Sequence, residues 1–337
     1  MKNARLAIIA LSMFTLIAPP AQAWNAVGHS LVAKLAYAKL TPAEREKVVA
    51  LLNKHPHAAL YLKADRPENV PEGEWMFMQA AVWSDWIRPP RNFQGNLADH
   101  PRHKFHRGPW HYVNRTYKAH QTDLSPGVPL PAETSIQQQL PLSVEIASKK
   151  MADDPGIAAD VSAEQNRAVR LCWAFHLIGD IHQPMHVASL VDPVRLPGGD
   201  EGGNKLSLRV DIGAEPTKLH TFWDSVLGTD VDPETIQELA DSLLNDARLT
   251  PEKLPQASNG DVNDWIAESY KLAAQHAYLN GDLPVVIWDD FKANTVTIND
   301  VPILPVGTEK NARRIARQQV MVAALRLADK LRLAIVD

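Results

Sequence analysis

Apolar residues recur three and four positions apart along much of the chain, which is the spacing of an amphipathic helix. The two longest stretches of this kind are residues 261–279 and 309–333. A third stretch, 171–181, is almost continuously apolar and stops just before Pro184, so we expect a buried helix there. The pattern therefore predicts a mainly helical protein.

Helix start signals support this prediction. Residues 41–44 (Thr-Pro-Ala-Glu) combine an N-cap, a proline at the first helical position and a capping-box acid, and predict a helix to about Asn53. Similar signals occur at Thr134 with Gln137, at Ser162 with Gln165 and at Asp232-Pro233-Glu234. The pair His220 and Asp224 lies where another helix is expected to begin.

Strand patterns are few. Residues 205–211 alternate between polar and apolar, and 295–304 resembles a hairpin around Asn299-Asp300. The proline-rich loops 88–108 and 117–131 are typical of excursions from one domain, and no repeat or linker interrupts the chain. The expected fold class is all-α: a mainly helical single domain with one or two short β-hairpins.

The first 23 residues have the layout of a cleavable secretory signal. Lys2 and Arg5 precede an apolar run over 6–18, and small residues flank Gln22 at 21–23. The run is too short to span a bilayer comfortably, and no later stretch is apolar enough to do so. We therefore expect export to the periplasm or the extracellular space, no membrane anchor, and a single domain over 24–337.

Composition narrows the class of protein further. The chain has 337 residues, 45% hydrophobic and 22% charged, as in a soluble globular protein. The formal charge of −4 would become −6 after loss of residues 1–23, so no basic surplus predicts a broad duplex-DNA surface. A single cysteine, Cys172, excludes an intramolecular disulfide and a Cys-rich zinc finger. Thirteen histidines remain as the main chemical clue.

Histidine and aspartate fall in metal-ligand patterns. His176 and Asp180 are four residues apart on one helix face, His186 follows Pro184, and His220 with Asp224 repeats the four-residue spacing. A single such pair is more often a hydrogen-bonded pair, but two pairs with a third histidine favour a metal site. No G-x-S-x-G elbow and no phosphate-binding glycine loop is found, and Cys172 lies in an apolar helix.

Six motifs occur in one order. They are Trp24-Asn25-Ala26-Val27-Gly28-His29, Trp83-Ser84-Asp85-Trp86-Ile87-Arg88, Trp110-His111-Tyr112-Val113, the block from His176 to His186, Gly202-Gly203-Asn204, and Leu219-His220 to Trp223-Asp224. Together with the C-terminal helix they resemble the zinc-dependent class I nuclease / 3′-nucleotidase family, the S1/P1-type single-strand nucleases. That family is related to bacterial zinc-dependent phospholipase C.

The resemblance implies a helical fold that holds three zinc ions per chain in a cleft. Asp85, His111, His176 and Asp180 would bind the first zinc, and His186, His220 and Asp224 the second. The third would take the amino group and carbonyl of Trp24 with His29, and Asp180 would bridge it to the first. An α-amine with a pKa of about 7.7–8.0 can lose its proton to zinc near neutral pH, so cleavage before Trp24 would create a ligand.

The implied activity of the 24–337 catalytic domain is zinc-dependent hydrolysis of phosphodiester bonds in single-stranded DNA or RNA to 5′-phosphate products, with 3′-nucleotidase activity and no obligate protein partner. Asp85 would orient the nucleophile, and Arg88 would stabilise transition-state charge. Tyr112 would stack on a base and Asn204 would hydrogen-bond the substrate. Two alternatives stay open: a phospholipase C, whose members usually carry Glu where this chain has Asp224, and a non-catalytic exported metal-binding protein.

The other histidines receive no metal in this interpretation. His182 is expected to be a hydrogen-bonding neighbour of the ligands. The cluster His100, His103 and His106 is expected in a solvated loop, because Pro101 and Arg102 indicate an exposed insertion. His55, His57, His120 and His276 carry no signal.

Overall fold

A computed structural model describes residues 24–129, 134–149, 157–158 and 160–335. The expected signal segment, residues 1–23, lies outside the described residues, so its cleavage stays a prediction. None of the described helices combines the length and the apolarity needed to cross a membrane.

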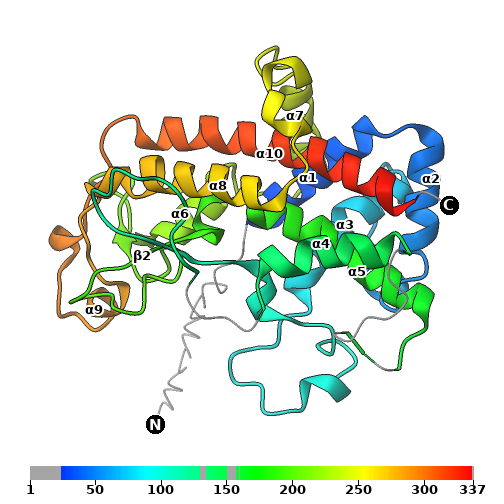
Figure 1. Ribbon diagram of the computed structural model, residues 1–337, viewed down its shortest axis with the longest axis horizontal. Helices are drawn as coiled ribbons and strands as arrows, with labels where there is room; N and C mark the ends of the chain where they lie inside the picture. The colour runs from blue at the N-terminus through cyan, green and yellow to red at the C-terminus, as the bar shows by residue number, and fades with distance from the viewer. Residues whose placement is uncertain (1–23, 130–133, 150–156, 159, 336–337) are drawn as a thin grey trace, which may run out of the picture.

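The described residues are mainly helical, as predicted, with a long C-terminal helix running along one side (Figure 1). The α-helices are α1 Ala26–Lys39, α2 Pro42–Leu52, α3 Glu72–Trp86, α4 Ile136–Ala147, α5 Ala163–Ile181, α6 Leu219–Ser225, α7 Pro233–Leu244, α8 Val262–Leu272, α9 Trp288–Lys292 and α10 Thr308–Ala334. Short 3₁₀ or π turns are η1 Ala58–Leu62, η2 Leu97–Asp99, η3 Gly108–His111, η4 Pro184–His186, η5 Pro251–Lys253, η6 Pro255–Ser258, η7 Ala273–Ala277, η8 Leu279–Gly281 and η9 Ile298–Asp300.

The core lies where α1, α3, α5 and α10 meet. α1 packs against both α10 and α3, while α3 packs against α5 and α5 against α4. One cluster of buried apolar residues extends from Trp24 to Ala334 and includes five fully buried tryptophans. α1 and α3 are buried on most of their faces, so they lack the one-sided apolar pattern that identifies a surface helix.

Two small two-stranded sheets complete the fold. β1 (Arg115–Tyr117) pairs in parallel with β2 (Ala188–Leu190), and β3 (Ser207–Leu208) pairs antiparallel with β4 (Thr217–Lys218). The pairing of β1 with β2 brings η3 and η4 together, since β1 follows η3 and β2 follows η4 in the chain. The Val113 N–H donates to the His186 carbonyl at 2.9 Å, which holds the ends of η3 and η4 side by side.

Most helix predictions are confirmed. One predicted helix start and two predicted strand segments need correction. The capping box of α4 is Ser135 with Gln138, one residue later than Thr134 with Gln137. The strand expected over 205–211 is limited to β3. The hairpin expected over 295–304 is wrong: Thr297 and Asp300 form a capping box that starts η9, so the Asn299-Asp300 pair lies in a helical turn.

Candidate metal centre

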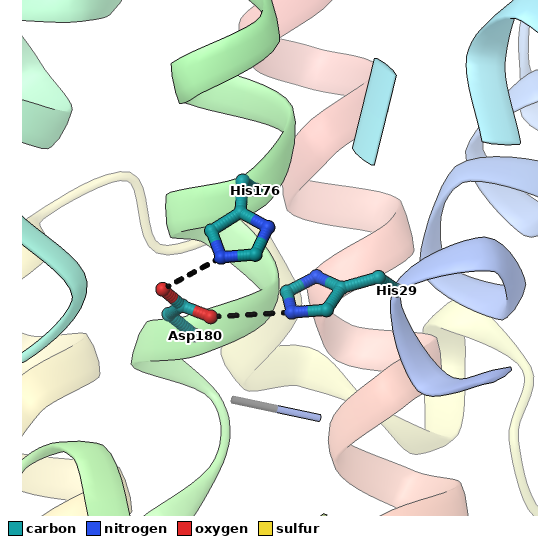
Figure 2. A group of neighbouring side chains, drawn as sticks. All are labelled: His29, His176 and Asp180. Carbon is teal, nitrogen blue, oxygen red and sulfur yellow. Dashed lines mark ion pairs between the residues drawn. The ribbon is translucent and has the colours of Figure 1, made fainter. Parts of the chain in front are cut away.

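Helix α5 provides the centre of a buried group of histidine and aspartate side chains. His176 and Asp180 lie one turn apart near its C-terminal end and are fully buried. His29 comes from α1 and points at the same carboxylate (Figure 2). The Nε2 atoms of His29 and His176 lie 3.3 Å and 3.2 Å from the two oxygens of Asp180, so this carboxylate contacts both rings.

Two further residues extend this group from other elements. Asp85 lies in the last turn of α3, and His111 ends η3. His111 Nδ1 is 3.0 Å from Asp180 Oδ2, and His176 Nε2 is 3.9 Å from Asp85 Oδ2. The structure thus gathers Asp85, His111 and His176 into one group that could hold a metal ion, and His29, His176 and Asp180 into a second.

A third group consists of His186, His220 and Asp224. His186 ends η4, while the other two lie one turn apart on α6, where His220 Nε2 is 3.6 Å from Asp224 Oδ1. Gln183 donates to Asp224 Oδ1 at 2.7 Å and so fixes the carboxylate. The structure therefore brings together all eight side chains expected to bind zinc.

Backbone carbonyls orient three of the rings. The Nδ1 atoms of His176, His186 and His220 lie 2.7, 2.6 and 2.6 Å from the carbonyl oxygens of Ala81, His111 and Gly202. A ring that donates from Nδ1 keeps a lone pair on Nε2, and this arrangement is typical of metal-binding histidines. The Nε2 atoms of His186 and His220 therefore point into their group as acceptors. Burial alone would lower the pKa of His176, but Asp180 and Asp85 raise it to about 9, so a metal that binds its Nε2 must displace a proton.

The donor set fits zinc. Atoms held 2.0–2.2 Å from a tetrahedral zinc are about 3.3–3.6 Å apart, close to the separations observed around Asp180. Several of the inward atoms are buried without a hydrogen-bond partner among the described residues: His29 Nε2, Asp85 Oδ2, Asp180 Oδ1 and His186 Nε2. Buried polar atoms are seldom left unpaired, so cations bound in the three groups would explain the arrangement.

Burial sets the protonation of most of these rings. It lowers the pKa of His29, His111, His186 and His220, to about 4 for His111 and about 3 for His220. These four imidazoles are therefore neutral at pH 7 and have the lone pair that a metal needs.

The pKa values of Asp180 and Asp224 are shifted in opposite directions because the two carboxylates have different neighbours. Burial alone would raise the pKa of Asp180, but the nearby His176 and His186 hold it well below its ordinary value. For Asp224, burial together with the charges of Asp85 and Asp180 outweighs the hydrogen bond from Gln183, so its pKa lies well above the ordinary value. A bound cation would reverse this penalty for Asp224.

Trp24 lies beside the same centre. Its side chain is fully buried, and the following Asn25 N–H donates to the Asp224 carbonyl at 3.2 Å. Asn25 also caps α1 through its side chain, which places His29 one turn into that helix. Gly28 is needed here, since a Cβ at this position would lie 2.7 Å from the Cβ of Trp24. Whether the Trp24 amino group binds a metal stays a prediction.

The three residues expected to contact substrate surround the centre. Arg88 donates to Asp85 Oδ1 at 3.1 Å, and its side chain is 24% exposed. Tyr112 follows His111 directly and is exposed. Asn204 donates to the Glu201 carbonyl at 3.0 Å in the loop that contacts His220. Their roles stay predictions.

The remaining histidines correct part of the sequence analysis. His103 is not solvated but buried, with Nδ1 2.7 Å from the Ile87 carbonyl, and burial lowers the pKa of His106 to about 3. His55 and His57, which carry no signal in the sequence, are buried against Trp83. His182 lies outside the metal groups, as expected, but its ring does not hydrogen-bond to a ligand: Nδ1 lies 2.7 Å from the Ile178 carbonyl and Nε2 accepts from Arg326 at 2.8 Å.

Asp200 is a buried carboxylate that the sequence analysis missed. Ser189, Tyr278 and the Leu190 N–H donate to it at 2.9–3.1 Å. Burial nevertheless raises its pKa to about 6. Asp200 begins the loop whose Gly202 carbonyl orients His220, so it anchors one ligand of the third group.

This carboxylate should make stability depend on pH. Its pKa is raised on folding, so its folded form keeps a proton between pH 4 and 6 that the unfolded chain has lost, and stability falls as pH rises through this window. A shift of about two pKa units corresponds to about 3 kcal/mol. The free energy of unfolding of the wild type, measured by urea relative to Asp200→Asn, should fall by about this amount from pH 4 to 6 and then level off. A difference that does not change with pH would contradict the assignment.

Comparison with known proteins agrees with the geometry. A family model described as S1/P1 Nuclease matches residues 24–335. Endonuclease 4 of Arabidopsis thaliana is 33% identical over 144 residues, which is 40% of this chain and 45% of that protein. Endonuclease 3 of the same plant is 27% identical over 143 residues, 37% of this chain and 42% of that protein.

These aligned segments span less than half the length of the curated relatives. The family model, in contrast, covers nearly the whole chain, including all eight clustered side chains, Trp24 and α10. The resemblance drawn from six ordered motifs is thereby confirmed, and the chain belongs to the S1/P1 nuclease family.

Proposed function

We propose that this chain is an exported, zinc-dependent endonuclease that hydrolyses phosphodiester bonds of single-stranded DNA or RNA to 5′-phosphate products and also acts as a 3′-nucleotidase. One observation carries the proposal: eight buried histidine and aspartate side chains converge in three adjoining groups within a nuclease family. Three zinc ions per chain would use these groups, with Trp24 completing the one that contains His29. Bound zinc supplies a water of lowered pKa and polarises phosphate oxygens.

The chain's own residues would position the substrate. Asp85 accepts a hydrogen bond from Arg88 and lies in the last turn of α3, where its carboxylate can orient the nucleophile. The Arg88 guanidinium is partly exposed and can donate to a phosphate oxygen as negative charge develops there. Asn204, beside the loop that orients His220, offers a hydrogen bond to the substrate.

Tyr112 should set the affinity for unpaired strands. Its ring is exposed next to His111, and stacking of a base on an aromatic ring contributes about 1–3 kcal/mol. Tyr112→Ala should therefore raise the KM for denatured DNA by roughly 5- to 150-fold with a smaller change in kcat, whereas Tyr112→Phe should leave KM within about twofold. Steady-state kinetics on both variants checks this. Equal KM values for the alanine and phenylalanine variants would remove Tyr112 from the substrate site.

A substrate panel tests the proposed function. The chain beginning at Trp24 is assayed on denatured DNA, RNA, 3′-AMP and phosphatidylcholine, each with and without chelator. We expect cleavage of the first three, with 5′-phosphate ends on the polymers, and loss of all three with chelator. Hydrolysis of phosphatidylcholine alone would favour the related phospholipase C activity. No hydrolysis by the zinc-loaded chain would favour a metal-binding protein, and hydrolysis unaffected by chelator would exclude the zinc mechanism.

A further inference from the structure

A cationic hollow lies on α10, apart from the metal groups. It encloses about 510 Å³ and is lined by Arg248, Lys310, Arg313, Arg314, Arg317 and Asp246, besides uncharged residues. Five cations against one carboxylate give the lining a formal charge of +4, although the whole chain carries −4. The hollow is therefore a local concentration of positive charge on a chain that is acidic overall.

The four cations from α10 form a stripe. Residues 310, 313, 314 and 317 are spaced by three and four positions, so their side chains share one helix face. At 1.5 Å per residue the stripe is roughly 10 Å long. Arg248 completes the hollow from the segment that follows α7, and Arg317 joins α10 to α7 by donating to the Ser242 hydroxyl at 3.0 Å.

Ion pairs within the protein neutralise only part of this charge. Asp246 pairs with Arg248 at 2.7 Å and lies 3.7 Å from Arg317, while Glu309 pairs with Arg313 at 3.1 Å. Among residues 24–129, 134–149, 157–158 and 160–335, no acidic group forms an ion pair with Lys310 or Arg314. Both side chains are exposed, so two cations remain available to an anion from outside.

The stripe opposes the stability of its own helix. Like charges three or four residues apart repel each other. Lys310 also lies in the first turn of α10, where the helix dipole disfavours a cation. Arrangements that conflict with local stability are expected at functional sites.

We propose that the cationic hollow binds the sugar–phosphate backbone of a single-stranded nucleic acid at a distance from the cleaved bond. This inference rests on the proposed function, because it needs a polymeric substrate. A stripe of about 10 Å can contact two or three successive phosphates. Among the described lining residues none is aromatic, so the contacts would be to phosphates and independent of base sequence.

The double variant Lys310→Gln/Arg314→Gln tests the inference. Its control, Lys47→Gln/Lys54→Gln, removes the same charge from α2 (Lys47) and from the turn that follows it (Lys54). Helix α2 packs near the opposite end of the 27-residue α10. Both are assayed with wild type on a 20-nucleotide thymidine oligonucleotide and on a thymidine dinucleotide over a range of salt concentrations. The melting temperature of the hollow variant should not fall, since a like-charge repulsion has been removed.

We expect the hollow variant to raise the KM for the oligonucleotide about tenfold at low salt and to reduce the salt dependence of log KM by about 1.4, or 0.7 for each lost phosphate contact. Its kcat/KM on the dinucleotide should equal that of wild type, and the α2 control should match wild type on both substrates.

Three results would overturn this inference while leaving the proposed function intact: an unchanged oligonucleotide KM, an equal effect in the α2 control, or a parallel loss of activity on the dinucleotide. An unchanged oligonucleotide KM, together with weaker binding of the hollow variant than of wild type to phosphatidylglycerol vesicles, would also overturn the inference. That result would indicate that the hollow binds a membrane surface. A wild-type chain that cleaves neither substrate would instead overturn the proposed function, and this inference with it.

Discussion

Replacing Asp180 by asparagine is expected to lower the rate of denatured-DNA cleavage by at least about 10³-fold, which corresponds to about 4 kcal/mol of transition-state stabilisation. The reason lies in its position. One oxygen lies 3.3 Å from His29, and the other lies 3.0 Å from His111 and 3.2 Å from His176. An asparagine has the same size but no charge, and its amide nitrogen is not a metal ligand. Two of the three groups would therefore lose affinity for zinc together.

The measurement is kcat on denatured DNA with zinc content determined on the same samples. Asp241→Asn is the matched control, because Asp241 lies on α7 outside the metal groups and is exposed. The control should retain wild-type rate and zinc. An Asp180→Asn protein that keeps its full zinc content and a rate within tenfold of wild type would refute the shared role of this carboxylate.

Removal of metal should have the second large effect, on stability. Without a cation, three buried carboxylates and five buried imidazoles adjoin in the core with unpaired inward atoms. One metal site at a free zinc concentration of 1,000 times Kd contributes about 4 kcal/mol, so three sites contribute about 12 kcal/mol. In a domain of about 300 residues each kcal/mol shifts Tm by about 1.5 °C, because the unfolding entropy is about 2.1 cal/mol/K per residue. Chelation should therefore lower Tm by at least about 10 °C.

Calorimetry of the zinc-loaded and the chelated protein checks this effect. Adding back zinc, but not magnesium, should restore the original Tm, because imidazole-rich sites suit zinc while magnesium prefers all-oxygen ligands. An identical Tm after complete metal removal would show that the groups are stable without a cation. Restoration by magnesium would point to a different metal.

Local spacing predicted only part of the site. His176 with Asp180 and His220 with Asp224 can be found from sequence, because each pair shares one helix face. Asp85 and His111 have no such signal. They reach His176 only because α3 packs on α5 and because the pairing of β1 with β2 holds η3 beside η4. Their assignment before the structure depended on family resemblance.

The wrong predictions concern segments where side-chain hydrogen bonds, rather than the spacing of apolar residues, determine the local structure. The Asn299-Asp300 pair was interpreted as a hairpin turn, but the side chains of Thr297 and Asp300 cap a helical turn instead. Pro101 and Arg102 are exposed, as expected, but the Arg102 guanidinium donates to the Trp86 carbonyl at 2.7 Å and holds the loop against the end of α3, where His103 is buried. Long-range contacts of this kind, and the anchoring of Asp200 by Tyr278, leave no periodic trace in the sequence.

Zinc content per chain, measured by elemental analysis of protein that begins at Trp24, tests the central claim most directly. The claim is that eight clustered side chains and the Trp24 amino group together hold three zinc ions. The account predicts three zinc ions per chain, and about two in a variant with one extra residue before Trp24. Less than one zinc per chain after loading would contradict the metal centre, and an unchanged count in the extended variant would contradict the role of Trp24.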